Sequence, residues 1–351
     1  MDKKYLWKLA ETAAKHLNYV QNRINRRNGT VVCYDPSLHT ENLGDEIIMA
    51  SCRAVLSGLF PADSFHNIST HCLPVEEDKK AAGEAKYAFV CGTNLLTSRI
   101  EHHWRWVLPE GLRGKWPYRN VVLLGAGWGE YQDRCSDYSR MVYRCMLNPG
   151  VSHSVRDRYT LEKLREAGIS NVIHTGCPTT WGLTPEFCRG IPGKKAINAV
   201  TTLTDYRRDP LRDEELLNIL GSHYENLYFW PQGCGDEGYL NTLKRPENLR
   251  ILPRKLSSYE EVLKPGAVDY VGTRLHGGIH ALNHGVRSII IAVDNRAAEM
   301  GRDLNLPVLP RERAGQELEK RICSEFPTEI RIPQGEIQRF LRQFSRKREK
   351  P

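Results

Sequence analysis

Short apolar runs of strand length alternate with amphipathic helical patterns along the chain, and this alternation constrains the fold more than any other feature of the sequence. The runs end in glycine or in a polar turn, and a helical pattern follows some of them. A rhythm of this kind is typical of an α/β fold with parallel strands. In the first half the predicted strands are 31–34, 87–91, 121–124, 152–155 and 171–174, and the predicted helices are 45–59 and 157–167.

The alternation is interrupted at 181–195, where proline, glycine and lysine replace the apolar pattern. Such a segment favours an interdomain linker, and 351 residues exceed what one core usually holds outside barrels. We therefore predict Rossmann-like domains at 31–190 and 191–333 that face each other across a cleft. In the second half the predicted strands are 196–200, 226–229, 249–252, 267–271 and 288–293, and the predicted helices are 213–220, 257–264, 276–283 and 296–304.

Two basic segments with helical patterns flank these domains, at 1–30 and 334–351. The first could lie on an anionic membrane surface, and it could equally pack on the N-terminal domain with its basic face in water. The tail could cross back to the N-terminal domain. No apolar run reaches the roughly 18 residues of a membrane span, and no secretion signal is visible. We expect a cytoplasmic protein, with peripheral contact at the inner membrane face as a hypothesis.

The charge balance favours anionic partners. Lys and Arg total 50 against 42 Asp and Glu, which gives a net charge of +8. Nucleic acid is not expected as a partner, because no basic and aromatic motif of a known nucleic-acid reader is present. The ten cysteines form no C-x-x-C pair, so we expect them to be reduced and mainly in the core.

The segment 267–282 places an arginine and a histidine at a turn between a predicted strand and a predicted helix. Helix N-termini favour anions, and a guanidinium can hold a carboxylate or phosphate with two hydrogen bonds. Arg274 and His276 are therefore candidates for an anion site. His276, His280 and His284 recur at a spacing of four, which could place imidazoles on one helix face for a metal. We predict no metal there, because no glutamate follows His276 and no further ligand is evident nearby.

The turn after the first predicted strand contains Asn42, Gly44 and Asp45. Glycine allows a tight approach of a ligand, and Asn42 can donate a hydrogen bond. Asp45 could be a general base that points into the cleft, or an ordinary helix cap. The spacing alone leaves both alternatives open.

Three other predicted strands of the first half end in candidate binding features. Two of them are followed by glycine-bearing loops, and the third ends at Arg156. The loop at 125–129 departs from the G-x-G-x-x-G pattern, so a nicotinamide cofactor is not expected. Arg156 could share one multiply charged ligand with Arg274 across the cleft, or it could pair with a neighbouring carboxylate such as Asp157. The loop residues expected at the cleft are Gly92, Thr93, Asn94, Gly125 and Gly127.

In their order and separation, these motifs resemble the polysaccharide pyruvyl transferase family. The resemblance covers about 31–305 and is carried most specifically by 154–157 and 273–276. The chain departs from the family pattern at Gly176-Cys177-Pro178, where many members have Gly-Asp-Pro, and at Cys91-Gly92-Thr93, where many have a glycine triplet.

The resemblance implies a GT-B-like fold and the transfer of pyruvyl from phosphoenolpyruvate to a sugar hydroxyl pair, with release of phosphate. It suggests donor contacts from Arg156, Arg274, Leu275 and His276. We expect His276 to act as acid or phosphate ligand and Asp45 as base, with no metal or organic cofactor. The acceptor would be a saccharide of a cell-surface polysaccharide, such as capsule or exopolysaccharide. A lipid-diphosphate link on this acceptor would suit the basic termini.

Two other functions remain open at this stage. A GT-B glycosyltransferase with a nucleotide-sugar donor would have the same architecture, and Glu260 or Glu261 could then bind the ribose. A saccharide-binding protein that has lost its chemistry would also keep the cleft. The ordered motifs favour pyruvyl transfer over both.

Overall fold

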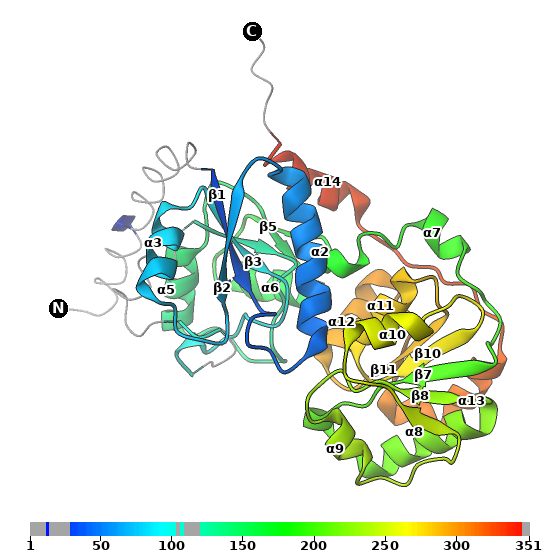
Figure 1. The fold of residues 1–351 in the computed structure, drawn as a ribbon. Coiled ribbons are helices and arrows are strands. Elements are labelled where there is room, and N and C mark those ends of the chain that lie inside the picture. Colours follow the sequence, from blue (N-terminus) through cyan, green and yellow to red (C-terminus); the bar gives the residue numbers. More distant parts are fainter. Residues whose placement is uncertain (1–11, 14–28, 103–105, 109–119, 346–351) are drawn as a thin grey trace. The chain divides into compact units, whose positions relative to one another are not determined.

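The computed structural model describes residues 12–13, 29–102, 106–108 and 120–345 (Figure 1). The chain forms two compact units. Unit 1 consists of Met1–Thr40, Ile48–Pro178 and Pro333–Pro351, and unit 2 consists of Glu41–Ile47 and Thr179–Ile332. The helix predicted for 1–30 lies almost entirely outside the described residues, and so does the end of the predicted basic tail.

Unit 1 contains a parallel sheet in the order β2-β1-β3-β4. This is the start of the doubly wound order 2-1-3-4-5, whose switch point lies between the first and third strands. A second parallel pair, β5-β6, continues beside β4 through the hydrogen bond from Gly125 N to Ser154 O at 3.0 Å. The strands are β1 (Thr30–Asp35), β2 (Ser64–Ser69), β3 (Tyr87–Cys91), β4 (Val121–Leu124), β5 (His153–Val155) and β6 (Val172–His174).

Two helices of unit 1, α5 and α6, begin at polar caps. Ser136 Oγ accepts a hydrogen bond from Ser139 N at the start of α5, and Asp157 caps α6 by accepting from Thr160 N. The helices are α2 (Leu43–Leu59), which starts in the 41–47 segment of unit 2, α3 (Glu76–Glu84), α5 (Asp137–Met146), α6 (Arg158–Glu166) and α14 (Gln334–Arg342), with 3-10 turns at Ile100–His102 and Pro178–Thr180.

The C-terminal tail belongs to unit 1, one of the alternatives that the sequence left open. Its Phe344 ring packs edge-on against Tyr87 and Phe89 of β3, with ring centroids 5.2 and 5.3 Å apart. Phe340 of α14 and Phe60 complete this aromatic cluster. The tail is therefore anchored by apolar burial.

Unit 2 contains six parallel strands in the order β12-β11-β10-β7-β8-β9. Numbered within the unit, this is the Rossmann order 3-2-1-4-5-6, whose switch point lies between β7 and β10. The strands are β7 (Asn198–Thr201), β8 (Leu227–Phe229), β9 (Leu249–Ile251), β10 (Val268–Gly272), β11 (Ser288–Ala292) and β12 (Val308–Pro310).

Helices cover both faces of the unit 2 sheet. On one face, leucines of α8 and α13 form a continuous core with β8 and β11. On the other face α11 packs on β10 and β11, where Gly278 allows a close approach to Tyr270 and Ile290. The helices are α7 (Pro185–Arg189), α8 (Pro210–His223), α9 (Asp236–Leu240), α10 (Leu256–Val262), α11 (Leu275–Asn283), α12 (Asn295–Leu304) and α13 (Arg311–Cys323), with a 3-10 turn at Asp205–Arg207.

The segment predicted as a linker, 181–195, lies within unit 2, and the chain changes unit between Pro178 and Thr179. The proline and glycine that suggested a linker begin and end a helix here. Thr184 caps α7, Pro185 occupies its first turn and Gly190 is its C-cap. The division at 190 predicted from composition therefore differs from the structural one.

The predicted strands are present, but several elements were not predicted. The edge strand β2 was missed because it is half exposed and has no continuous apolar run. The ten cysteines are all free, as expected, although Cys72, Cys234 and Cys323 are exposed and do not belong to the core. Among the described residues no helix is both long enough and apolar enough to cross a membrane.

Candidate functional site

The turn after β10 lies at the switch point of the unit 2 sheet, where chain order reverses between β10 and β7. Ligands of doubly wound sheets bind at this point, outside the carboxyl ends of the strands. Backbone hydrogen bonds join the two strand ends, from Thr273 N to Thr202 O at 3.0 Å and from Arg274 N to Thr202 Oγ1 at 3.1 Å. The predicted Arg274 turn is therefore held in position by β7.

Arg274 is buried at this turn, and its guanidinium is paired with two carboxylates of unit 2. Nε donates to Asp236 Oδ2 at 3.0 Å and to Leu203 O at 3.2 Å. Nη2 donates to Asp205 Oδ1 at 2.8 Å and also to Asp236 Oδ1. Nε and Nη2 carry all the hydrogen bonds that this guanidinium makes to described residues, which leaves Nη1 for a ligand.

The two carboxylates paired with Arg274 determine the net charge around its guanidinium. Asp236 is fully buried, and burial raises its pKa, while the attraction of Arg274 acts in the opposite direction. Asp205 is only three-quarters buried. The positive charge of Arg274 is thus compensated within unit 2, and an anionic ligand would compete with these carboxylates or use Nη1 and nearby backbone N–H groups.

A second arginine stands beside Arg274, and the two share one aromatic ring. The Tyr206 ring lies 5.0 Å from Arg274 Cζ and 5.7 Å from Arg296 Cζ. Arg296 Nε donates to Asp294 Oδ2 at 2.9 Å, so it too has an internal carboxylate partner. Neither Tyr206 nor Arg296 was predicted as a site residue.

The loop after β8 connects the Asn42 turn to the Arg274 turn within unit 2. Gln232 Nε2 donates to Asn42 Oδ1 at 2.7 Å, and Gly44 N donates to the same oxygen at 3.1 Å. Among the described residues Gln232 Oε1 has no hydrogen-bond partner, although it is buried, and it lies 3.1 Å from where a Cβ of Gly277 would be. A ligand donor at the start of α11 would satisfy this buried oxygen.

The other predicted residues of this group are also buried. Asp45 is 8% exposed, and its Oδ2 accepts a hydrogen bond from Asn42 Nδ2 at 3.4 Å. Leu275 and His276 begin α11 and are 5% and 4% exposed. The structure thus brings Asn42, Gly44 and Asp45 into one unit with Arg274 and His276.

The remaining predicted loops meet in unit 1, around Arg156. Gly92, Thr93 and Gly125 have positive φ angles of 65°, 53° and 66°. These turns let the loops after β3 and β4 join, through the hydrogen bond from Gly127 N to Thr93 O at 2.8 Å.

Arg156 is almost fully buried and has internal partners, which is one of the two alternatives that the sequence left open. Its Nη1 donates to Asn94 Oδ1 at 2.6 Å and its Nε to Asp157 Oδ2 at 3.1 Å. Nη2 lies 3.1 Å from the same Asp157 oxygen without hydrogen-bond geometry. Gly127 makes room for this arrangement, because a Cβ there would lie 2.3 Å from Arg156 Cζ.

We expect the substitution Gly127→Ala to displace the Arg156 guanidinium and to lower the free energy of unfolding by about 1–3 kcal/mol, the usual cost of overpacking. Urea denaturation of the purified variant measures this change. Gly238→Ala is the matched control, because nothing lies within 4 Å of a Cβ at that position. Equal stability of the two variants would contradict the packing described here.

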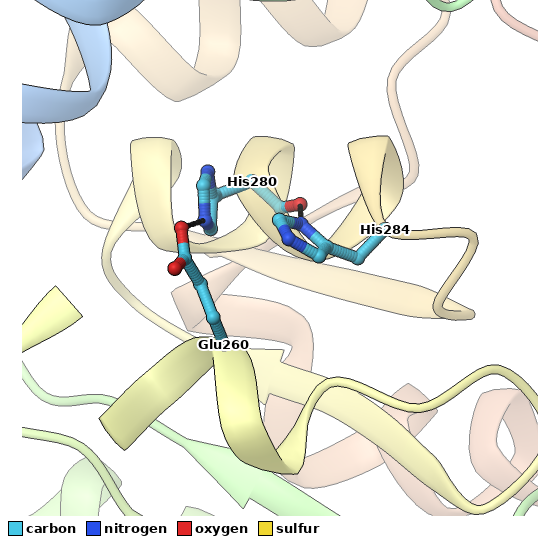
Figure 2. A group of neighbouring side chains, drawn as sticks. All are labelled: Glu260, His280 and His284. Carbon is cyan, nitrogen blue, oxygen red and sulfur yellow. Dashed lines mark hydrogen bonds and ion pairs between the residues drawn. The ribbon is translucent and has the colours of Figure 1, made fainter. Parts of the chain in front are cut away.

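Sequence reasoning missed Gln232, which donates a hydrogen bond to Asn42, and Asp205 and Asp236, which pair with Arg274. A usable signal was present, since Asp205 follows the end of β7 and Asp236 follows β8. Among the described residues, one group has metal-binding geometry: Glu260, His280 and His284, also in unit 2 (Figure 2). It is distinct from the Arg274 pairs and is considered separately below.

Two α/β units, each with a doubly wound parallel sheet and polar turns at its strand ends, define the class of GT-B-like proteins with two Rossmann-like domains. The UDP-GlcNAc 2-epimerase of Methanocaldococcus jannaschii, solved with UDP-GlcNAc and UDP, shares this fold at a TM-score of 0.53 and 12% identity, over 90% of this chain and 97% of that one. S. aureus MnaA, solved with UDP, has a TM-score of 0.48 and 9% identity, over 86% and 91% of the two chains.

Within this class, the chain belongs to the polysaccharide pyruvyl transferase family, whose model matches residues 42–295. The match includes the Asn42 turn, the Arg156 strand and the Arg274 turn. A search of curated proteins gave no match. The M. jannaschii structure is only 12% identical to this chain, so it supports the fold alone.

Proposed function

We propose that this pyruvyl transferase uses phosphoenolpyruvate and forms a ketal on two hydroxyls of one saccharide. The observation that carries this proposal is the segment after β8 in unit 2, whose Gln232 donates a hydrogen bond to Asn42 and whose Asp236 pairs with Arg274. The proposed base, Asp45, lies three residues after Asn42, and the proposed acid, His276, lies two residues after Arg274. Family membership supplies the reaction class.

The proposed reaction balances without a redox step. The methylene carbon of phosphoenolpyruvate takes a proton and becomes a methyl group, and one sugar hydroxyl adds to the neighbouring carbon. The second hydroxyl then bonds to that carbon as phosphate leaves. The diol loses two protons, of which one is now in the methyl group and the other departs with phosphate.

Each step needs a group of a kind that the proposed site contains. His276 would deliver the proton or contact the phosphate, and Asp45 would take a proton from the attacking hydroxyl. Arg274, through Nη1, would stabilise the donor carboxylate or phosphate. Arg156 and Leu275 are further proposed donor contacts, as the family resemblance implies. No step requires a metal or organic cofactor.

The acceptor proposal rests on charge. The net charge of +8 and the basic residues in 1–30 and 334–351 favour an acidic acceptor, such as a saccharide on a lipid diphosphate at the inner membrane face. This assignment places the reaction in the synthesis of a capsule or another surface polysaccharide.

The test incubates the protein with phosphoenolpyruvate and candidate lipid-linked or free saccharides. We expect the acceptor mass to rise by one pyruvate ketal and free phosphate to appear in equal amount. Thermal shift adds a control, because phosphoenolpyruvate should raise the melting temperature and nucleotide sugars should not. Stabilisation by a nucleotide sugar alone would replace the proposal with a glycosyltransferase.

We expect Asp45→Asn to lower kcat for pyruvyl transfer by about 100-fold, because the amide cannot accept the hydroxyl proton. The amide has nearly the same shape, so stability should change little. Phosphate release at saturating substrate measures the effect. Glu46→Gln, one residue further along α2, is the control that should retain activity, and an Asp45→Asn variant of normal kcat would remove the base assignment.

A further inference from the structure

His280 of α11, its C-cap His284 and Glu260 of α10 form a compact group in unit 2. Figure 2 shows Glu260 and His280 pointing toward each other from their two helices, with His284 one turn further along. His280 Nε2 lies 3.1 Å from Glu260 Oε1, and one ligand atom from each of the three residues lies within 4.8 Å of the others. The sequence showed the spacing of the histidines but not the third ligand, which comes from another helix.

A hydrogen bond fixes the His284 ring in the tautomer that can bind a metal ion. Its Nδ1 lies 2.9 Å from the backbone oxygen of His280. A carbonyl oxygen only accepts hydrogen bonds, so Nδ1 carries the proton and Nε2 keeps its lone pair. A ring nitrogen fixed by a carbonyl in this way is the usual second contact of a metal-binding histidine.

Aromatic stacking holds His280 in place. Its ring stacks on Tyr259 at a centroid distance of 5.9 Å, and Tyr259 stacks on Trp230 at 4.0 Å. Both aromatic rings are buried, and Tyr259 Oη donates to Gly277 O at 2.8 Å. The His280 ring therefore stands on a rigid support, as a preorganised ligand should.

Exposure also suits metal binding. The Glu260 side chain is 41% exposed, so the group is open to an ion from solvent.

We propose that Glu260, His280 and His284 bind one divalent transition-metal ion, with Zn²⁺ the best fit. Two imidazoles and one carboxylate are a zinc ligand set, whereas Mg²⁺ and Ca²⁺ prefer oxygen alone. Metal–ligand bonds of about 2.0–2.2 Å place neighbouring ligands of a tetrahedral ion roughly 3.3 Å apart. The Glu260–His280 pair at 3.1 Å meets this spacing, and the ligand atoms of all three residues lie within 4.8 Å of one another.

The expected consequence of the ion is to tie α10 to α11. The Arg274 turn precedes α11 directly, so an ion at the C-terminal end of α11 would stiffen the helix whose first turn contains His276. This inference stands apart from pyruvyl transfer, since neither proposal requires the other.

The experiment titrates Zn²⁺ into chelator-treated, dialysed protein by isothermal calorimetry. We expect one ion per chain, with affinity at least 100-fold weaker in His284→Ala and also weakened in Glu260→Gln. The control is His66→Ala. His66 pairs with Asp78 at 2.8 Å in unit 1, so it offers one imidazole and one carboxylate but belongs to no group of three among the described residues.

Two further readouts separate this site from binding elsewhere. Zn²⁺ should raise the melting temperature of the wild type and of His66→Ala, but not of His284→Ala. Co²⁺ should give a tetrahedral visible spectrum without the intense near-ultraviolet thiolate band that ligation by an exposed cysteine would add. Zinc affinity that is unchanged in His284→Ala and Glu260→Gln, or no binding by the wild type, overturns the proposal.

Discussion

Replacement of Arg287 by methionine is expected to lower the free energy of unfolding by about 3–5 kcal/mol, the cost of leaving a buried charge without its partner. Arg287 is 1% exposed, and its Nη1 donates to the buried Asp269 Oδ2 at 2.7 Å. Nε donates to Gly193 O, and Nη2 donates to the carbonyl oxygens of Arg321, Ile322 and Ser324.

The large effect follows from how many groups depend on this guanidinium. Without it, the Asp269 carboxylate keeps only Tyr224 as its side-chain donor, at 2.8 Å, and the carbonyl oxygens that end α13 lose theirs. Urea denaturation measures the loss. The control is Arg313→Met, because Arg313 pairs with Glu317 on an exposed face, where a pair contributes about 0–1 kcal/mol. A loss below 1 kcal/mol in Arg287→Met would contradict the buried network.

The sequence predicted the central strands because their signal is local. Runs such as 121–124 and 288–293 are apolar at successive positions, as strands buried on both faces must be. The same runs located the strand ends, so the Arg274 turn could be predicted at a sheet edge before the strand order was known. The order itself, which makes this edge a switch point, depends on contacts that no local pattern records.

The contacts that could not be predicted join residues far apart in the sequence. The pairing of Arg156 with its neighbour Asp157 is short-range, and the sequence offered it as an alternative. Arg274 pairs with Asp236, 38 positions away, and no spacing rule relates the two. Glu260 likewise reaches His280 from another helix, so the sequence lacked the third ligand of the proposed metal site.

Arg274→Ala is expected to reduce pyruvyl transfer to background and to destabilise the fold by about 3–5 kcal/mol, because Asp236 then becomes a buried carboxylate without a cation. Phosphate release and urea denaturation measure the two effects. The single variant alone does not separate donor binding from structural support, since both accounts predict lost activity.

The double variant Arg274→Met, Asp236→Asn separates them, because it removes both charges. The asparagine oxygen can still accept the hydrogen bond from Gly233 N, which is 2.7 Å long in the native chain. Most of the lost stability should therefore return. If Arg274 acts on the donor through Nη1, the refolded double variant stays inactive and phosphoenolpyruvate no longer raises its melting temperature. If instead activity returns with the fold, Arg274 serves only to neutralise Asp236, and the anion must be held by the backbone N–H groups at the start of α11.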